Sequence, residues 1–193
     1  MQLLSQKQIK STKRLLDNGA VLAVPTETVY GLAVKFDHAD AVAKLLSIKS
    51  RKTHDDNKVL TLMLADVAEI GQYAQLNAIA TKIATQHFPG ELTLVLPKNP
   101  NFQNHYFDHF ETIGIRIPNH TFMLKLLKLT GSLLVTSANP RGETPCHNST
   151  EVQRQLPAVD GVIIGQSGGS LPSTVISIID TEPKILRQGG LII

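Results

Sequence analysis

The apolar residues of this chain follow two patterns, which together predict an α/β fold. Spacings of three or four residues indicate amphipathic helices, and short apolar runs between turn residues indicate buried strands. The helical pattern predicts helices over residues 5–18, 39–48, 77–87, 122–129 and 150–156, with a short helix behind Asp66. The strand pattern predicts strands over residues 21–24, 59–64, 92–96, 113–117, 133–135, 162–164, 174–179 and 184–186.

The order and spacing of these elements indicate how they assemble. Ser5 with Gln8 matches a capping box for the first helix, and Gly19 stands where that helix should end. The last three strand-like runs lie too close together for crossover helices, so part of the sheet must be antiparallel. We therefore expect one α/β domain over residues 1–193, with a twisted, mixed parallel and antiparallel sheet and helices packed on it.

Composition and charge narrow the class of protein. The 193 residues suit one domain, and a formal net charge of +3 is compatible with polyphosphate or RNA without indicating either. Tryptophan is absent, which disfavours an aromatic platform for stacking bases. Cys146 is the only cysteine, so an intrachain disulfide is excluded and a reducing cytoplasm is favoured. Neither a signal peptide nor a membrane-spanning run is found, so we expect a soluble, cytoplasmic protein.

A polar cluster follows the first strand, at Pro25–Leu32. Pro25 ends the strand because proline has no N–H for the sheet, and Gly31 permits a turn or a close approach. Open α/β sheets bind ligands beyond the carboxyl ends of their strands, so this segment is a candidate site. A plain turn between strand and helix explains the segment equally well.

Three known functional motifs are considered and rejected, because the surrounding residues do not fit them. Gly165–Gly169 matches the G-x-S-x-G nucleophile elbow, but Pro172 stands where a helix is needed and no histidine follows His147. His105 and His109 have the spacing of zinc ligands but lack the glutamate partner. No Gly-Lys-Ser/Thr occurs, which excludes a Walker P-loop.

Cations at element ends form a more coherent pattern. Lys49 and Arg51 follow the predicted second helix, with Lys58 further on, and together they could hold a polyphosphate. Their position also suits a solvated basic helix end. Arg116 lies within an apolar strand, where a buried guanidinium needs a carboxylate or phosphate partner, and Gly114 indicates close approach of another group.

Hydroxyl and amide groups follow two later strands. Thr136–Gly142 offers hydroxyls, the Asn139 amide and free backbone N–H groups, although an Asx turn would use the same residues. Ser173 precedes one strand and Arg187 ends another. Cations and hydroxyls without a nucleophile suit electrostatic stabilisation of phosphate chemistry better than acid–base hydrolysis.

Taken in order, these segments resemble the Sua5/YrdC family of threonylcarbamoyl-AMP synthases. The resemblance extends from about Ala20 to Arg187 and rests on seven segments: Pro25–Leu32, residues 49–51, 89–93, 114–118, 137–139 and 173–175, and Leu186-Arg187. It implies the short, single-domain form of the family, with a YrdC/RibB-like mixed sheet bearing a positive cleft. It also implies synthesis of L-threonylcarbamoyl-AMP and pyrophosphate from ATP, L-threonine and bicarbonate or CO2.

The resemblance assigns roles to individual residues. Thr28, Arg116 and Ser173 would hold threonine, and Lys49 and Arg51 would be catalytic, stabilising the leaving pyrophosphate together with Mg2+. The residues implied to face ATP are Arg51, Lys58, Thr112, Ser137, Asn139 and Arg187. No protein-ligated metal is implied. Partner proteins would transfer the threonylcarbamoyl group to an adenosine beside the tRNA anticodon.

Some positions depart from the family pattern, and one alternative function stays open. Lys52 and Val59 stand where the family usually has prolines, so the loop over the phosphates is altered. Glu91 and Pro140-Arg141 also replace usual residues. The alternative is a non-catalytic module that binds tRNA, double-stranded RNA or ribosomes, which the basic residues Lys10, Lys13 and Arg14 permit.

Overall fold

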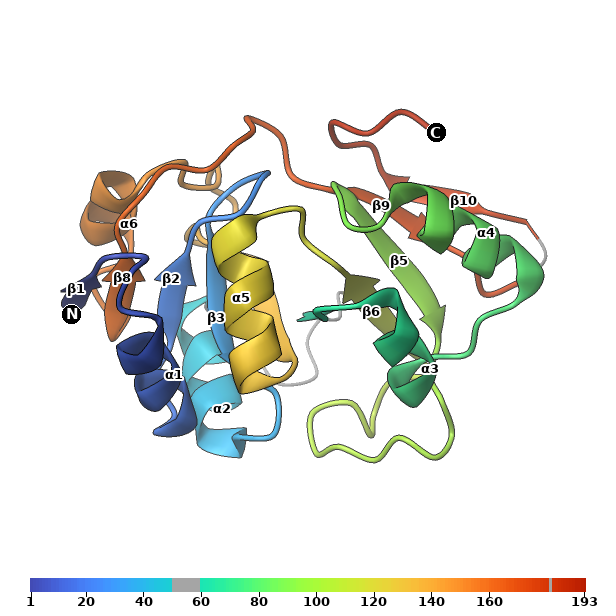
Figure 1. Ribbon diagram of the computed structural model, residues 1–193, viewed down its shortest axis with the longest axis horizontal. Helices are drawn as coiled ribbons and strands as arrows, with labels where there is room; N and C mark the ends of the chain where they lie inside the picture. Colours follow the sequence, from blue (N-terminus) through green and yellow to red (C-terminus); the bar gives the residue numbers. More distant parts are fainter. Residues whose placement is uncertain (50–59, 181) are drawn as a thin grey trace.

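The computed structural model describes residues 1–49, 60–180 and 182–193, and its centre is a mixed β-sheet (Figure 1). In the described residues ten strands pair in the order β1-β8-β2-β3-β7-β4-β6-β5-β9-β10. Their bounds are β1 Gln2–Leu4, β2 Leu22–Val24, β3 Gly31–Lys35, β4 Thr61–Met63, β5 Leu92–Pro97, β6 Thr112–Arg116, β7 Leu133–Ser137, β8 Gly161–Ile163, β9 Thr174–Ser177 and β10 Lys184–Arg187. The helices are α1 Ile9–Asp17, α2 Ala39–Ile48, the 3-10 turn η1 Val67–Glu69, α3 Ile70–Tyr73, α4 Ala78–His87, α5 Thr121–Thr130 and α6 Ser149–Gln155.

The pairing confirms a mixed parallel and antiparallel sheet. β2, β3, β7 and β4 pair antiparallel in succession, while β4 pairs parallel with β6 and β5 pairs parallel with β9. The last two strands form the antiparallel hairpin that the short gap between them predicts. The same argument was wrong for β8, which lies between β1 and β2 near the opposite edge of the sheet. The 10 residues between β8 and β9 instead run past the turn between β2 and β3 to the other side of the molecule, as the long orange segment at the top of Figure 1 shows.

Alternation along each strand divides the core into two layers. At β2, Ala23 and the preceding residue Val21 belong to a core with α2, whereas Leu22 and Val24 belong to a core with α1 and α5. Successive strand residues point to opposite faces of a sheet, so each strand supplies both cores. Helices α2, α3, α4 and α6 cover one face, and α1 and α5 pack side by side on the other (Figure 1).

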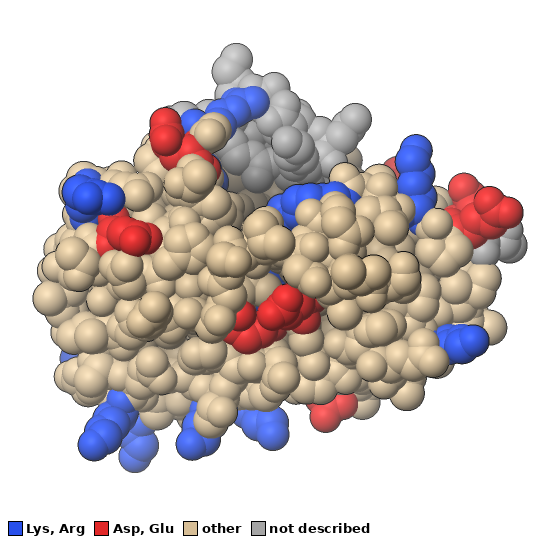
Figure 2. Space-filling view, turned by 90° about the horizontal axis from the view of Figure 1, so that it is seen from above, with Lys and Arg blue, Asp and Glu red and all other residues tan. Residues whose placement is uncertain are grey.

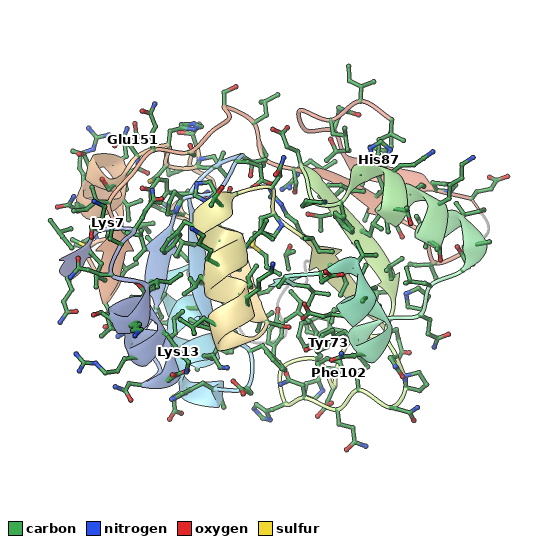
Figure 3. All side chains as sticks on the ribbon, viewed as in Figure 1. Lys7, Lys13, Tyr73, His87, Phe102 and Glu151 are labelled. Atoms are coloured by element: carbon green, nitrogen blue, oxygen red, sulfur yellow. The ribbon has the colours of Figure 1, made fainter. Side chains whose placement is uncertain are left out.

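An aromatic cluster closes the α3 side of the molecule. The rings of Tyr73 and Phe102 meet edge to face with centroids 5.0 Å apart, and Figure 3 shows them side by side below α3. Phe36 contacts both rings, and Phe107 extends the cluster into the loop between β5 and β6. Edge-to-face aromatic pairs are worth about 1 kcal/mol beyond their buried area, so this cluster holds an otherwise irregular loop in place.

Three local predictions differ from the structure. The segment after Pro25 does not lead into a helix: it joins β2 to β3 as a hairpin, because Gly31–Lys35 pairs antiparallel with β2. Helix α1 begins at Ile9 with Gln8 as its N-cap, and the Ser5–Gln8 contact forms a separate turn before it. Strand β1 was also missed, since its three residues carry no pattern of their own and become a strand only beside β8.

Candidate active site

A cavity of about 680 Å³ opens on the sheet face that carries α1 and α5, beside the part of that face on which these helices pack. Its floor consists of alternate strand residues, and their partners on the other face belong to the core with α2 and α4. The floor residues are Thr61 and Met63 of β4, Thr93 and Val95 of β5, Thr112, Gly114 and Arg116 of β6, and Val135 and Ser137 of β7. Threonine, glycine and arginine thus replace leucine where no helix covers the sheet.

Arg116 is the most deeply placed cation of the cavity wall. Its side chain is 6% exposed, and Nη2 donates to Glu27 Oε1 and to Thr28 Oγ1, both at 2.8 Å. Nε is buried without a hydrogen-bond partner, as is Glu27 Oε2. Nη1 is therefore the guanidinium nitrogen that remains for an anionic ligand.

Lys49 reaches the cavity from the end of α2 and holds the loop after β7. Its ammonium donates to Ser137 O at 2.9 Å, to Asn139 O at 2.5 Å and to Asn139 Oδ1 at 2.8 Å. These three bonds tie the ammonium to the backbone and side chain with which the loop begins. Ser137 Oγ completes the cluster by donating to Asn139 Oδ1 at 2.6 Å.

Arg187 and Ser173 form a third group on the β9–β10 side. Arg187 donates from Nε and Nη2 to the Ser173 carbonyl at 3.1 and 2.8 Å, and Ser173 Oγ lies 2.8 Å from Thr93 Oγ1. Partial burial, and then the positive charge of Arg116, lower the pKa of the Arg187 guanidinium. Two cations close enough to influence each other create a positive potential that favours an anion between them.

The structure gathers the predicted site residues that it describes. These residues, which come from distant parts of the chain, all line this cavity: Thr28, Lys49, Thr112, Arg116, Ser137, Asn139, Ser173 and Arg187. Arg51 and Lys58 lie outside the described residues, as do Lys52 and Val59. Thr61 and Thr93 were not assigned from the sequence, although a threonine inside an apolar strand is a usable signal. A Cβ on Gly114 would have only ordinary contacts, so the protein's own packing does not require this glycine.

The patterns set aside on context form no catalytic arrangement. Ser167 Oγ donates to the backbone carbonyl of His147 at 3.0 Å, and its distance to the ring Nδ1 is 3.4 Å. Glu151 accepts from the backbone N–H of His147, so it does not orient the imidazole as a triad acid would. Among the residues described, no group of three or more histidine, cysteine, aspartate or glutamate side chains could hold a metal ion. No helix in the described ranges is long and apolar enough to cross a membrane.

Fold and site together define an α/β protein whose mixed sheet carries a cationic, hydroxyl-rich cavity for a small anionic ligand. The chain belongs to the Sua5/YciO/YrdC family: the family model, described as "Telomere recombination", matches residues 14–189. It is 34% identical over 181 residues to the threonylcarbamoyl-AMP synthase of Serratia proteamaculans, which covers 90% of this chain and 92% of that protein.

Solved structures agree with this membership. Sua5 from P. abyssi complexed with L-threonine matches with a TM-score of 0.90 and 27% identity, over 99% of this chain and 58% of that one. YciO from E. coli matches with a TM-score of 0.87 and 25% identity, over 98% of this chain and 95% of that one. This chain therefore spans little more than half the length of the P. abyssi protein.

Proposed function

We propose that the protein is a threonylcarbamoyl-AMP synthase, which converts ATP, L-threonine and bicarbonate or CO2 into L-threonylcarbamoyl-AMP and pyrophosphate. The observation that carries this proposal is that three cation-centred groups, around Arg116, Lys49 and Arg187, line one cavity with several hydroxyls. A relative with this reaction in its name shares 34% of the aligned residues. The assignment makes the protein a nucleotidyltransferase working in the cytoplasm.

The amino acid would bind at the Arg116 end of the cavity. Thr28 and Arg116 contact each other, so a carboxylate on Arg116 Nη1 would also lie near the Thr28 hydroxyl. Ser173 and Thr93 offer hydroxyls on the neighbouring strands, where the substrate side chain could be received. A threonine-complexed structure is known for a protein of the same fold, Sua5 of P. abyssi.

The nucleotide would bind toward the loop after β7. Lys49 holds Ser137 and Asn139 in place, and backbone and hydroxyl groups of such a loop suit an anionic ligand. Thr112 and Arg187 line the same cavity. We assign Arg51 and Lys58 to the phosphates from the sequence alone. Mg2+ would arrive bound to the triphosphate, which suits a metal that retains waters and prefers phosphate oxygens.

The reaction then needs placement and charge stabilisation more than acid–base groups. The threonine amine adds to CO2 and loses a proton to solvent, which gives a carbamate. A carbamate oxygen then attacks the α-phosphorus of ATP as the bond to pyrophosphate breaks. Fixed cations are worth most where negative charge develops in a cavity partly shielded from water. Arg51 and the loop held by Lys49 would supply this stabilisation on the pyrophosphate side.

The cavity favours an enzyme over an RNA-binding module. Its volume of about 680 Å³ lies within the range of small-molecule sites. Figure 2 shows lysine and arginine side chains in separate groups on the drawn face, one in its upper middle and others along its edges. The product would pass to partner proteins that modify tRNA, as the family resemblance implies.

The test is a reconstitution with ATP, Mg2+, L-threonine and bicarbonate, with the product followed by mass spectrometry. We expect threonylcarbamoyl-AMP, and its loss when either threonine or bicarbonate is omitted. Arg51→Ala should abolish pyrophosphate release while leaving the circular dichroism spectrum unchanged. Pyrophosphate release that does not depend on threonine would refute the proposed function, and salt-sensitive RNA binding without ATP turnover would favour the RNA-binding module.

A further inference from the structure

Glu27 forms a buried ion pair directly behind the proposed threonine site. Its side chain is 13% exposed and that of Arg116 is 6% exposed, and the pair is joined by one bond of 2.8 Å between Oε1 and Nη2. Thr26, Thr28 and Val29 line the cavity around it, whereas Glu27 is not among the lining residues. Glu27 therefore contacts the arginine that faces the ligand and lies behind the surface that the ligand meets.

The pair has an unusual geometry. Carboxylate and guanidinium commonly bond through two parallel contacts, but here Arg116 Nε and Glu27 Oε2 are buried and unpartnered. Leaving two buried polar atoms without partners is costly, so the arrangement calls for a reason other than stability. The consequence is that Glu27 and Thr28 occupy one end of the guanidinium, Nη2, and leave Nη1 for the cavity.

The backbone that carries Glu27 is itself clamped. Gly168 N and Gly169 N donate to Thr26 O and Thr28 O, each at 3.0 Å. A Cβ on Gly168 would come within 2.9 Å of Glu27 O, so only glycine lets the two segments approach this closely. The G-x-S-x-G segment, which has no catalytic geometry, thus serves to hold the Glu27 turn against the sheet.

From these contacts we infer that Glu27 is a positioning residue for threonine binding, which orients Arg116 through Nη2 so that Nη1 meets the substrate carboxylate. The inference rests on the proposed function for the identity of the amino acid. It assigns Glu27 no contact with substrate and no proton transfer. Its effect therefore belongs to the affinity for threonine, and the affinity for ATP should be independent of it.

A matched pair of variants separates orientation from charge. Glu27→Gln and Glu27→Met both remove the negative charge and keep the length of the side chain, but only glutamine can still accept from Arg116 Nη2. We expect Glu27→Met to raise the KM for threonine about 10- to 100-fold, the effect of losing one hydrogen bond to a charged group. Glu27→Gln should stay within about threefold of wild type, because a hydrogen bond of ordinary strength is kept. The KM for ATP should stay within about twofold in both variants.

Calorimetry, a control variant and thermal melting test the inference further. In calorimetric titrations without ATP, Glu27→Met should bind threonine more weakly than Glu27→Gln and wild type. The control variant Glu111→Gln, which changes an exposed residue just before β6, should bind threonine as tightly as wild type. Equal losses in Glu27→Gln and Glu27→Met, or no loss in either, would overturn the inference. A rise in the KM for both substrates with a lower Tm would mark a merely structural role and also overturn it. If wild-type protein neither binds threonine nor makes product, the proposed function fails and the inference falls with it.

Discussion

At the scale of single residues, the charged groups of this cavity are held by the protein's own polar atoms before any ligand arrives. Lys49 donates to Ser137 and Asn139, and Arg187 donates from two nitrogens to the Ser173 carbonyl. Such preorganisation reduces the reorganisation needed when charge develops in the reaction. For Lys49, these bonds indicate a role in shaping the loop after β7, and its contact with phosphate stays a prediction, as it does for Arg51.

Replacing Lys49 by methionine should therefore damage both the loop and the activity. The variant keeps the length of the side chain but removes the ammonium that donates to three acceptors of Ser137 and Asn139. We expect the free energy of unfolding to fall by about 1–3 kcal/mol. Threonylcarbamoyl-AMP synthesis should drop by about 100-fold or more, as when one electrostatic group of an active site is lost.

The control for this variant is Lys44, a lysine within helix α2, the helix that Lys49 follows. Lys44 pairs with Asp160, and the two side chains are 45% and 33% exposed. An exposed ion pair contributes about 1 kcal/mol or less, so Lys44→Met should lie close to wild type in urea denaturation and in activity. Equal stability losses in the two variants would contradict the role given to Lys49.

At the scale of elements, the N-cap of helix α5 is a histidine, and it can cap the helix only while its imidazole is neutral. His120 Nδ1 accepts from Met123 N at 3.4 Å and thereby caps the helix. Burial lowers the pKa of His120 below its ordinary value of 6.5, and the nearby charge of Glu27 opposes this effect. The folded state thus binds its proton less readily than the unfolded chain, and protonation of Nδ1 removes the capping acceptor.

The stability of the protein should therefore depend on pH through His120. Because the folded pKa lies below 6.5, this contribution is present above pH 6.5 and is lost as the pH falls below that value. His120→Asn keeps a good N-cap and cannot titrate, so its stability should fall less between pH 8 and pH 5.5. Urea midpoints at both pH values measure this difference. Parallel losses in wild type and His120→Asn would show that other groups carry the pH dependence.

Close packing of the turn after β10 leads to a second prediction at this scale, for a substitution of Gly189. A Cβ on Gly189 would lie 2.1 Å from Pro172 O and 2.6 Å from the Ser173 carbonyl carbon, both backbone atoms. Gly189→Ala must therefore move the Ser173 segment, at a cost of about 1–3 kcal/mol typical of overpacking. It should also weaken threonine binding, because Ser173 lines the cavity.

Gly71 provides the matched glycine for comparison. It lies within α3, and a Cβ there would meet nothing within 4 Å. Gly71→Ala should stabilise the protein by up to about 1 kcal/mol, since alanine is the better helix former. Thermal melts of the two variants should move in opposite directions, and a neutral Gly189→Ala would contradict the close contact with Ser173.

At the scale of the whole molecule, sheet order decides what the cavity contains. The order places β3 and β7 beside β4, then β6, β5 and β9, so the Thr28 turn, the Asn139 loop and Arg187 converge although the chain separates them widely. Helices α1 and α5 cover only part of this face, where the strands present apolar residues (Figure 1). These residues are Leu22 and Val24 of β2, Ala33 of β3, Met63 of β4, and Leu133 and Val135 of β7. The uncovered remainder of the face is the floor of the site. A hydrophobic core and a ligand cavity thus share one surface of one sheet.

Local patterns were enough for most elements and for choosing a set of polar positions that line one cavity. The helix from Ala39 to Ile48 has the predicted bounds, and the polar positions chosen from strand ends line one cavity. These features follow from short-range properties: periodicity, caps and turn residues act within a few positions of each other. The family resemblance likewise needed only the order of short segments along the chain.

Only the tertiary structure decided the pairings between distant residues. β1 and β3 are strands because neighbouring strands complete their hydrogen bonds. The residues of β1 and β3 by themselves did not predict either strand. The partner of Glu27 proved to be Arg116, 89 positions away, and Lys49 proved to hold Asn139, 90 positions away. Contacts of this kind depend on strand order and register, which neighbouring residues do not encode. The sequence alone thus determined a set of polar groups that line the cavity, and the three-dimensional packing decided which of them hold the others in place.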